Sequence, residues 1–501
     1  MKRLLLLLTR LLVITVFATC YAAAQGPAQE QPCSDPVDQN ACAPGLNLAP
    51  GTFSATPLID GSGQSYGDPD GNLVSLYGVY GNDEHMSSNQ AAQAHYNQGV
   101  TLAGSITPRC PDGSVPPPNS GCQVGDLTKP PAIVFLFVGF SNCDIEICGG
   151  NSDAWDGKDN PPNGHLAGQP CSTQCRNLNY PGGGTPWNQV TNHGGDGVIQ
   201  QSFLYQVYNP TPHLVGDHVV VFNSALGGQT LNRWDPTPAG YYASHDCPYG
   251  PDASNPECNY TRAQHDLEYN GYSDAQVQAI FLKSSDSFPQ CDLKGLYCAQ
   301  GAIPDAYLSE IYMGDIMRYL KCCTLDQDGH STGQPRYPNL KQVFITSRIY
   351  GGYADPTTHG CLMPEPFAFE EGFAVQRLIV AQINQAAGGD PTDPYSGEVN
   401  YGVTPWFDWG PYLWASGTNK SAGNQLFWCD STTRLNPLCE GNLGDFRYGD
   451  DADPVTYWGD HTHPTYKAEE KVANQLVKFI KGQLPAPQLN ISGWVTPWVG
   501  R

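Results

Sequence analysis

The chain has few basic residues, and this scarcity excludes several classes of partner. Lysine and arginine together number 25 against 48 aspartate and glutamate residues, so the formal net charge is −23 at pH 7. A protein that binds nucleic acid or an anionic membrane surface needs a basic patch that neutralises phosphates. We therefore expect neither as a partner. The acidic residues are scattered along the chain, which is typical of a solvated surface.

Long hydrophobic runs are missing after the first residues of the chain. The chain starts with Met1-Lys2-Arg3, and the apolar residues that follow end at Ala22-Ala23-Ala24. This pattern predicts a secretory signal peptide over residues 1–24 with an Ala-x-Ala cleavage site. Arg10 leaves the longest uncharged apolar run too short to cross a bilayer comfortably, which argues against a membrane anchor. We expect a soluble mature protein that is secreted or periplasmic.

Zinc-binding spacings are absent among the cysteines. The sequence has 18 cysteines but no Cys-x-x-Cys pair and no histidines at the spacing of a zinc site, so we expect no metal and no cofactor. In an exported chain, closely spaced cysteines indicate disulfides that fasten loops. The neighbouring pairs are Cys33/Cys42, Cys110/Cys122, Cys143/Cys148, Cys171/Cys175, Cys247/Cys258, Cys291/Cys298 and Cys429/Cys439, which leaves Cys322, Cys323 and Cys361 in the mature chain.

Strand and helix patterns alternate from residue 132 onwards. Near-continuous apolar runs predict buried strands over 132–138, His218–Asn223, Val277–Lys283 and Gln342–Ser347. Helical patterns cover Asp305–Leu320, Glu370–Gln385 and Thr465–Lys481. This alternation predicts an α/β protein whose central parallel sheet is covered by helices on both faces.

The segments around these elements predict the domain organisation. Residues 25–55 are typical of an exposed leader, residues 56–484 form one domain, and residues 485–501 form a C-terminal tail. Loop-rich insertions interrupt the domain at about 143–215, 235–275 and 424–458. Structureless loops of this length are uncommon and are usually functional. We expect disulfide-fastened insertions that wall a pocket at the carboxyl ends of the strands.

Two stretches at opposite ends of the chain carry residues suited to acyl transfer. The strand over 132–138 leads into Gly139-Phe140-Ser141-Asn142, and Gly459-Asp460-His461-Thr462-His463-Pro464 precedes the last predicted helix. Open α/β sheets place their chemistry at the carboxyl ends of central strands. A serine there becomes nucleophilic when a base accepts its proton, and the Asp460–His463 spacing allows the carboxylate to orient the imidazole. Either stretch alone is more often a plain turn or a helix start.

In this order, the two stretches resemble the SGNH (GDSL-like) hydrolase superfamily, and more closely a group of secreted bacterial SGNH-type proteins. The closer resemblance is carried by Tyr337–Lys341, Ser347–Ala354, Glu371–Val375 and Gly410–Ala415, and it covers roughly residues 130–482. It implies the flavodoxin-like, three-layer α/β/α fold of SGNH hydrolases. It also implies an esterase in which Ser141 is the nucleophile, His463 the general base and Asp460 the residue that orients the imidazole.

The resemblance further implies donors for an oxyanion hole. After the second strand, Gly228 fits the Gly-x-Thr pattern of the superfamily best, and Gly227 lies beside it. A glycine at this position lets the backbone approach the oxyanion with its N–H group. Asn142, next to the nucleophile, is a further candidate.

Asp286 is the departure from the superfamily pattern, because it aligns with an asparagine that donates its amide to the oxyanion. An ionised carboxylate there would repel the developing charge by about 4 kcal/mol at contact distance. Three alternatives follow. Asp286 is protonated, or it turns away and Asn142, Asn223 or Ser285 donates instead, or the site is impaired.

These residues predict a secreted carboxylic ester hydrolase that acts on an acylated or acetylated carbohydrate or a similar ester. The aromatic residues Trp406, Trp409, Tyr412 and Trp414 could stack on sugar rings, although such residues are more often part of a core. The alternative is a surface or glycan-binding protein that retains the fold with little or no catalysis. A metal-dependent phosphoesterase ranks last, because no tight His/Asp cluster is present.

Replacement of Asp286 by asparagine tests the alignment of the oxyanion hole. The change keeps the shape and exchanges an acceptor for a donor, and one well-placed donor contributes about 2.7–4 kcal/mol. We expect the rate on a p-nitrophenyl ester to rise about tenfold or more. A fall in kcat in a folded Asp286→Asn variant would contradict this alignment.

Overall fold

The structure of the protein is a computed structural model that describes part of the chain. The described residues are 65–67, 73–75, 90–118, 120–124, 127–140, 143, 146–147, 203–208, 214–216, 218–225, 229–237, 258–269, 271–285, 289–293, 295, 298–324, 332–346, 367–389, 393–411, 413, 428–429, 446–447 and 466–483.

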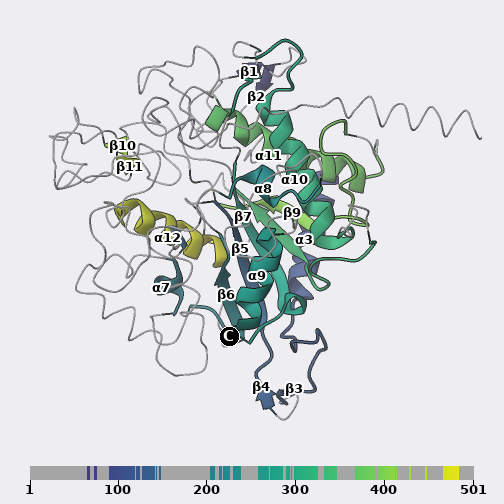
Figure 1. Cartoon of the computed structure of the whole chain (residues 1–501), viewed down its shortest axis with the longest axis vertical. Coiled ribbons are helices and arrows are strands. Elements are labelled where there is room, and N and C mark those ends of the chain that lie inside the picture. Colours follow the sequence, from purple (N-terminus) through teal and green to yellow (C-terminus); the bar gives the residue numbers. More distant parts are fainter. Residues whose placement is uncertain are drawn as a thin grey trace, which may run out of the picture.

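A five-stranded parallel sheet forms the centre of the molecule (Figure 1). Its strands, in spatial order, are β6 (Val219–Asn223), β5 (Ile133–Gly139), β7 (Val277–Lys283), β8 (Gln342–Ile345) and β9 (Trp406–Trp409). Every residue of these strands is buried. Strands covered on both faces need apolar side chains on both, which explains the runs of valine, isoleucine and phenylalanine.

The order of the strands creates a switch point beside β5. The chain passes from β5 to its neighbour β6, then returns across β5 to β7 and continues outward to β8 and β9. The direction of winding therefore reverses between β6 and β7. Open α/β sheets bind their ligands outside the carboxyl ends of the strands at such a reversal. In this chain that position is the end of β5.

Helices flank the sheet on both sides (Figure 1). On one side, α7 (Phe203–Tyr208) packs against α12 (Tyr466–Ile480), and the ring of Phe479 meets that of Phe344 in β8. On the other side, α10 (Asp305–Lys321) packs against α11 (Phe367–Ala386) and the short helix α8 (Leu231–Trp234), which contacts α9 (Cys258–Tyr269). The prediction of an α/β protein with a central parallel sheet flanked by helices is confirmed.

Four predicted strands and three predicted helices are present with ends shifted by at most a few residues, but other elements were missed. The helix α3 (Gln90–Gly104) is not among the helices predicted from the sequence. It packs over β8 and β9. Close approach is possible because Gly99 has no side chain: a Cβ there would lie 2.5 Å from the ring of Trp406. The remaining described elements are the 3-10 helix η4 (Asp274–Gln276) and three two-stranded sheets: β1 (Ser65–Gly67) with β2 (Leu73–Ser75), β3 (Cys122–Val124) with β4 (Leu127–Lys129), and β10 (Trp428–Cys429) with β11 (Phe446–Arg447).

The disulfides agree only in part with neighbour pairing. Cys110–Cys122 and Cys291–Cys298 are bonded as predicted, and Cys322 bonds to the adjacent Cys323. The predicted Cys143–Cys148 bond is wrong, because Cys143 is buried as a thiol. Its burial follows from its place directly after β5, where it packs into the core cluster. The other predicted pairs include residues outside the described part of the chain.

No helix among the described residues is long and apolar enough to cross a membrane. The predicted signal peptide (1–24), leader (25–55) and tail (485–501) lie outside the described residues, as do most of the three predicted insertions.

A buried polar group joins α3 to the outer strand β9. The Nδ1 atom of His95 lies 2.7 Å from the hydroxyl of Tyr401, and Nε2 lies 3.1 Å from the carbonyl oxygen of Phe407. The carboxylate of Asp408 lies 4.0 Å from the same Nε2 atom. Burial raises the pKa of Asp408 to about 7, although the backbone N–H of Trp409 donates to its Oδ1 atom and lowers it.

Asp408 should make folded stability decrease as the pH rises toward neutrality. The folded protein keeps a proton on this carboxyl between pH about 4 and 7, whereas the unfolded chain releases it. The carboxyl therefore disfavours folding progressively across this window, by at most about 4 kcal/mol. The Asp408→Asn variant has no titratable group at position 408. Its melting temperature relative to that of the wild type should therefore rise between pH 4.5 and 7.5. A constant difference in thermal melts would contradict the buried carboxyl.

Candidate functional site

Polar residues gather where the apolar strands β5, β6 and β7 end. Asn223 is the last residue of β6, Lys283 is the last of β7, and Ser284 and Ser285 follow. All four side chains are buried. Because the strands are parallel, their carboxyl ends lie at one edge of the sheet, which is the edge of the switch point. The structure therefore concentrates buried polar groups at the position expected for a ligand.

Gly139 is required at the end of β5. Its φ angle is +148°, which side chains rarely tolerate, and a Cβ there would lie 1.8 Å from the carbonyl oxygen of Lys283. The same oxygen accepts a hydrogen bond from the N–H of Phe140 at 3.3 Å. The chain can therefore leave β5 in close contact with β7 only because residue 139 has no side chain.

An ion pair is buried beside this turn. The Nζ atom of Lys283 lies 2.5 Å from both carboxylate oxygens of Glu146, in the short segment after β5. The exposed fractions of the two residues are 0% and 1%. Burial of two charges is costly unless their geometry is good, and here each of the carboxylate oxygens accepts from the ammonium group. The pair joins the end of β7 to the segment that follows β5.

The segment after β6 is attached to the same two strand ends. The Oγ atom of Ser284 donates to the carbonyl of Gln229 at 3.2 Å, and the N–H of Leu231 donates to the carbonyl of Ser285 at 3.1 Å. The indole of Trp234 donates to the carbonyl of Gly139 at 3.3 Å. The helix α8 is thus fixed against β5 and β7 together.

The hydroxyl of Ser285 differs from the other polar groups at this edge in its hydrogen bonding. It is fully buried, and within the described part of the chain its Oγ atom has no hydrogen-bond partner. A buried polar atom without a partner costs free energy, so such an atom often indicates a position where another group binds. The residue follows β7 at the carboxyl edge and immediately precedes Asp286.

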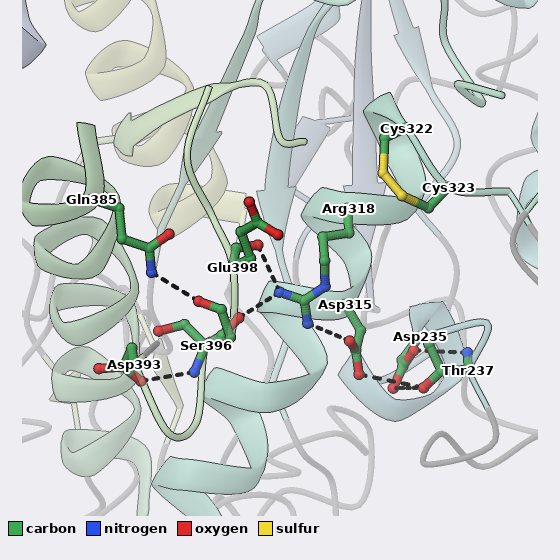
Figure 2. A network of polar contacts seen from close by, with 11 residues as sticks. Asp235, Thr237, Asp315, Arg318, Cys322, Cys323, Gln385, Asp393, Ser396 and Glu398 are labelled. Carbon is green, nitrogen blue, oxygen red and sulfur yellow. Dashed lines mark hydrogen bonds and ion pairs between the residues drawn. A yellow bond between two sulfur atoms is a disulfide. The ribbon is translucent and has the colours of Figure 1, made fainter. Parts of the chain in front are cut away.

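A polar network continues from α8 toward the outer face of α10. Burial and the negative charge of Asp315 raise the pKa of Asp235 well above its usual range. Thr237 donates to Asp235 at 2.9 Å and contacts Asp315 at 3.4 Å. Figure 2 shows Arg318 between Asp315 and the backbone carbonyls of Ser396 and Glu398, which it contacts at 2.5 and 3.0 Å. This network fixes α8 to α10 and the 393–398 loop.

The residues predicted as catalytic or as oxyanion donors lie outside the described part of the chain. They are Ser141, His463, Asp460, Gly228, Gly227, Asn142 and Asp286. The described residues that precede three of these segments are Phe140 after β5, Ala225 after β6 and Ser285 after β7. These three points, at which the chain leaves β5, β6 and β7, share the carboxyl edge of the sheet. The convergence of Ser141 with His463 and Asp460 stays a prediction, because all three residues lie outside the described part of the chain.

The aromatic residues proposed for sugar stacking are partly core residues. Trp406 and Trp409 are 1% and 2% exposed, so the packing interpretation is correct for these two and the sugar-binding interpretation is wrong. Each lies in β9, between helices and the neighbouring strand β8. Tyr412 and Trp414 lie outside the described residues.

Sequence reasoning did not find the pair formed by Glu146 and Lys283 or the contact made by Trp234. The pair joins residues 137 positions apart, and a single sequence carries no sign of such a contact.

Among the described residues, no group of three or more histidine, cysteine, aspartate or glutamate side chains could hold a metal ion. Neither family models, nor curated proteins, nor solved structures gave a match to the chain.

A methyl group at position 139 should disrupt the carboxyl edge. The Gly139→Ala variant must relieve the contact with Lys283 and adopt an unfavourable φ angle, which together should cost about 2–5 kcal/mol of unfolding free energy. Urea unfolding measures this loss. Gly104→Ala is the matched control, because no atom lies within 4 Å of its added Cβ and its stability should be unchanged or higher. Similar losses in both variants would contradict the close approach of β5 to β7.

Proposed function

We propose that the protein is a secreted serine hydrolase, and specifically a carboxylic ester hydrolase with Ser141 as its nucleophile. The supporting observation is the position of β5, whose carboxyl end lies at the switch point of the sheet. Ser141 follows the described end of this strand by only two residues. The polar groups of Asn223, Lys283 and Ser285 surround the same edge.

We also propose that the sheet and its helices form an SGNH-type hydrolase fold. Numbered along the chain, the strands of the sheet have the order 2-1-3-4-5, which is the flavodoxin-like arrangement. Together with the sequence motifs, this order supports an SGNH-type hydrolase fold. The insertions are proposed to wall the pocket above the carboxyl edge.

The proposed mechanism is acyl transfer through a covalent intermediate. His463 accepts the proton of the Ser141 hydroxyl as its oxygen attacks the ester carbonyl, and Asp460 holds the imidazole in the orientation that permits this transfer. The tetrahedral intermediate collapses when the protonated His463 gives its proton to the leaving alcohol. Water, activated by the same imidazole, then releases the acid from the acyl-enzyme.

The oxyanion is proposed to bind to backbone N–H groups near Gly227 and Gly228 and to Asn142. Asp286 can contribute only if it is protonated, because its ionised form would oppose the developing charge. The buried hydroxyl of Ser285 supports the alternative that this neighbouring residue donates instead, since its Oγ atom lacks another partner among the described residues. Loss of one donor reduces the rate about 10²–10³-fold, so a missing asparagine is compatible with a slow enzyme.

The proposed substrate is an acylated or acetylated carbohydrate or a similar small ester. This proposal relies on the predicted signal peptide over residues 1–24 and on the aromatic residues of the chain. Burial of Trp406 and Trp409 leaves Tyr412 and Trp414 as the aromatic residues that could contact a sugar ring. The signal peptide also supports a secreted or periplasmic location.

Labelling with a fluorophosphonate probe tests the proposed function. The probe reacts with an activated serine, so the wild type should be labelled and Ser141→Ala should not. His463→Ala should also lose labelling, because the imidazole activates the hydroxyl. Ser120→Ala, at an exposed position outside the sheet, is the matched control and should label like the wild type. An unlabelled but folded wild type would reject the hydrolase and favour the surface or glycan-binding protein.

A further inference from the structure

Lys283 holds the segment that follows β5 at two points. Its backbone carbonyl accepts the N–H of Phe140 at 3.3 Å, directly after the strand. Its side chain reaches the carboxylate of Glu146, six residues further along, at 2.5 Å. One residue of β7 therefore fixes both ends of the segment 140–146, and this segment contains Ser141 and Asn142.

The geometry at the strand end makes this attachment tight. Gly139 and Lys283 are register partners in the parallel pair formed by β5 and β7. The missing side chain of Gly139 allows the carbonyl of Lys283 to approach, and the N–H of Phe140 binds the same oxygen. Inside the segment, the buried Cys143 thiol lies 3.7 Å from the carbonyl oxygen of Val138. The described residues of the segment are thus attached to β7 through Phe140 and to β5 through Cys143.

Stability alone is a poor explanation for the Lys283–Glu146 pair. Both residues are buried, and replacement of a buried ion pair by apolar residues of similar volume is often neutral or stabilising. A buried pair does restrict geometry, because each charge requires its partner at hydrogen-bond distance. The catalytic power of a nucleophile depends strongly on such placement, since an error of about 1 Å can reduce the rate about 10²-fold.

We propose that Lys283 and Glu146 are positioning residues for Ser141, which hold the 140–146 segment in the geometry that presents the nucleophile to its base and substrate. This inference rests on the proposed function for its catalytic part. Its structural part, the attachment of the segment to β7, does not depend on catalysis and can be measured separately.

The double variant Lys283→Met/Glu146→Leu removes the pair without leaving a buried charge unpaired. We expect it to fold, with kcat on a p-nitrophenyl ester about 10–100-fold lower and KM within about twofold, because the variant misplaces the nucleophile and leaves the substrate contacts intact. The rate of fluorophosphonate labelling should fall in parallel with kcat. Unchanged kcat in the folded variant would overturn the positioning role.

Alkylation of Cys143 gives a readout that is independent of activity. This thiol is 0% exposed in the held segment, so native wild type should react slowly with iodoacetamide, as measured at the Cys143 peptide by mass spectrometry. The double variant should react at least about tenfold faster, because the segment opens more often when its attachment to β7 is lost. Equal rates would overturn the attachment. If the wild type shows no labelling that depends on Ser141, the proposed function fails, and alkylation alone decides whether the segment is held.

A matched control removes a different ion pair. Asp274 and Arg336 interact at 3.0 Å, and they precede β7 and β8, at the amino edge of the sheet. The variant Asp274→Asn/Arg336→Met should leave kcat and the alkylation of Cys143 unchanged. Equal effects of both double variants would show a general loss of stability and overturn the specific role of Lys283.

Discussion

The close contact between the ends of β5 and β7 is the constraint on which the carboxyl edge depends. The carbonyl oxygen of Lys283 occupies the space where residue 139 would otherwise carry a Cβ atom. This approach sets the direction in which the chain leaves β5. It also brings the carbonyl of Gly139 within reach of Trp234, so the segment after β6 is fixed to the same place. Gly139 thus contacts both the end of β7, through Lys283, and the segment after β6, through Trp234.

The sequence predicts the sheet well where burial is uniform. Strands β5 to β8 were found because a strand covered on both faces must be apolar throughout. β9 was missed because its four residues include Asp408, a carboxyl that is tolerated inside the core because burial raises its pKa to about 7. α3 was missed because its buried face relies on alanine, glycine and His95 rather than on large apolar side chains.

The candidate site was less predictable than the fold, for a physical reason. The motif around Ser141 is local, because an apolar run that ends in Gly139-Phe140-Ser141-Asn142 marks it in the sequence. The contact made by Glu146 is not local: Lys283 reaches it across 137 positions, and the orientation of either side chain depends on the finished sheet. Ser285 was identified as one possible donor, but its burial, and the lack of a partner for its Oγ atom among the described residues, become visible only when β7 is packed.

The strand order also has a consequence for how sequence length can vary. β5 pairs on one side with β6 and on the other with β7, and long stretches of chain separate these partners. The entropy of closing a loop grows only with the logarithm of its length, by about 0.6 kcal/mol per doubling. Residues can therefore be gained or lost between Ile147 and α7, or between Thr237 and α9, at little expense to the sheet. Such a scaffold can diversify the surroundings of its carboxyl edge while its core remains the same.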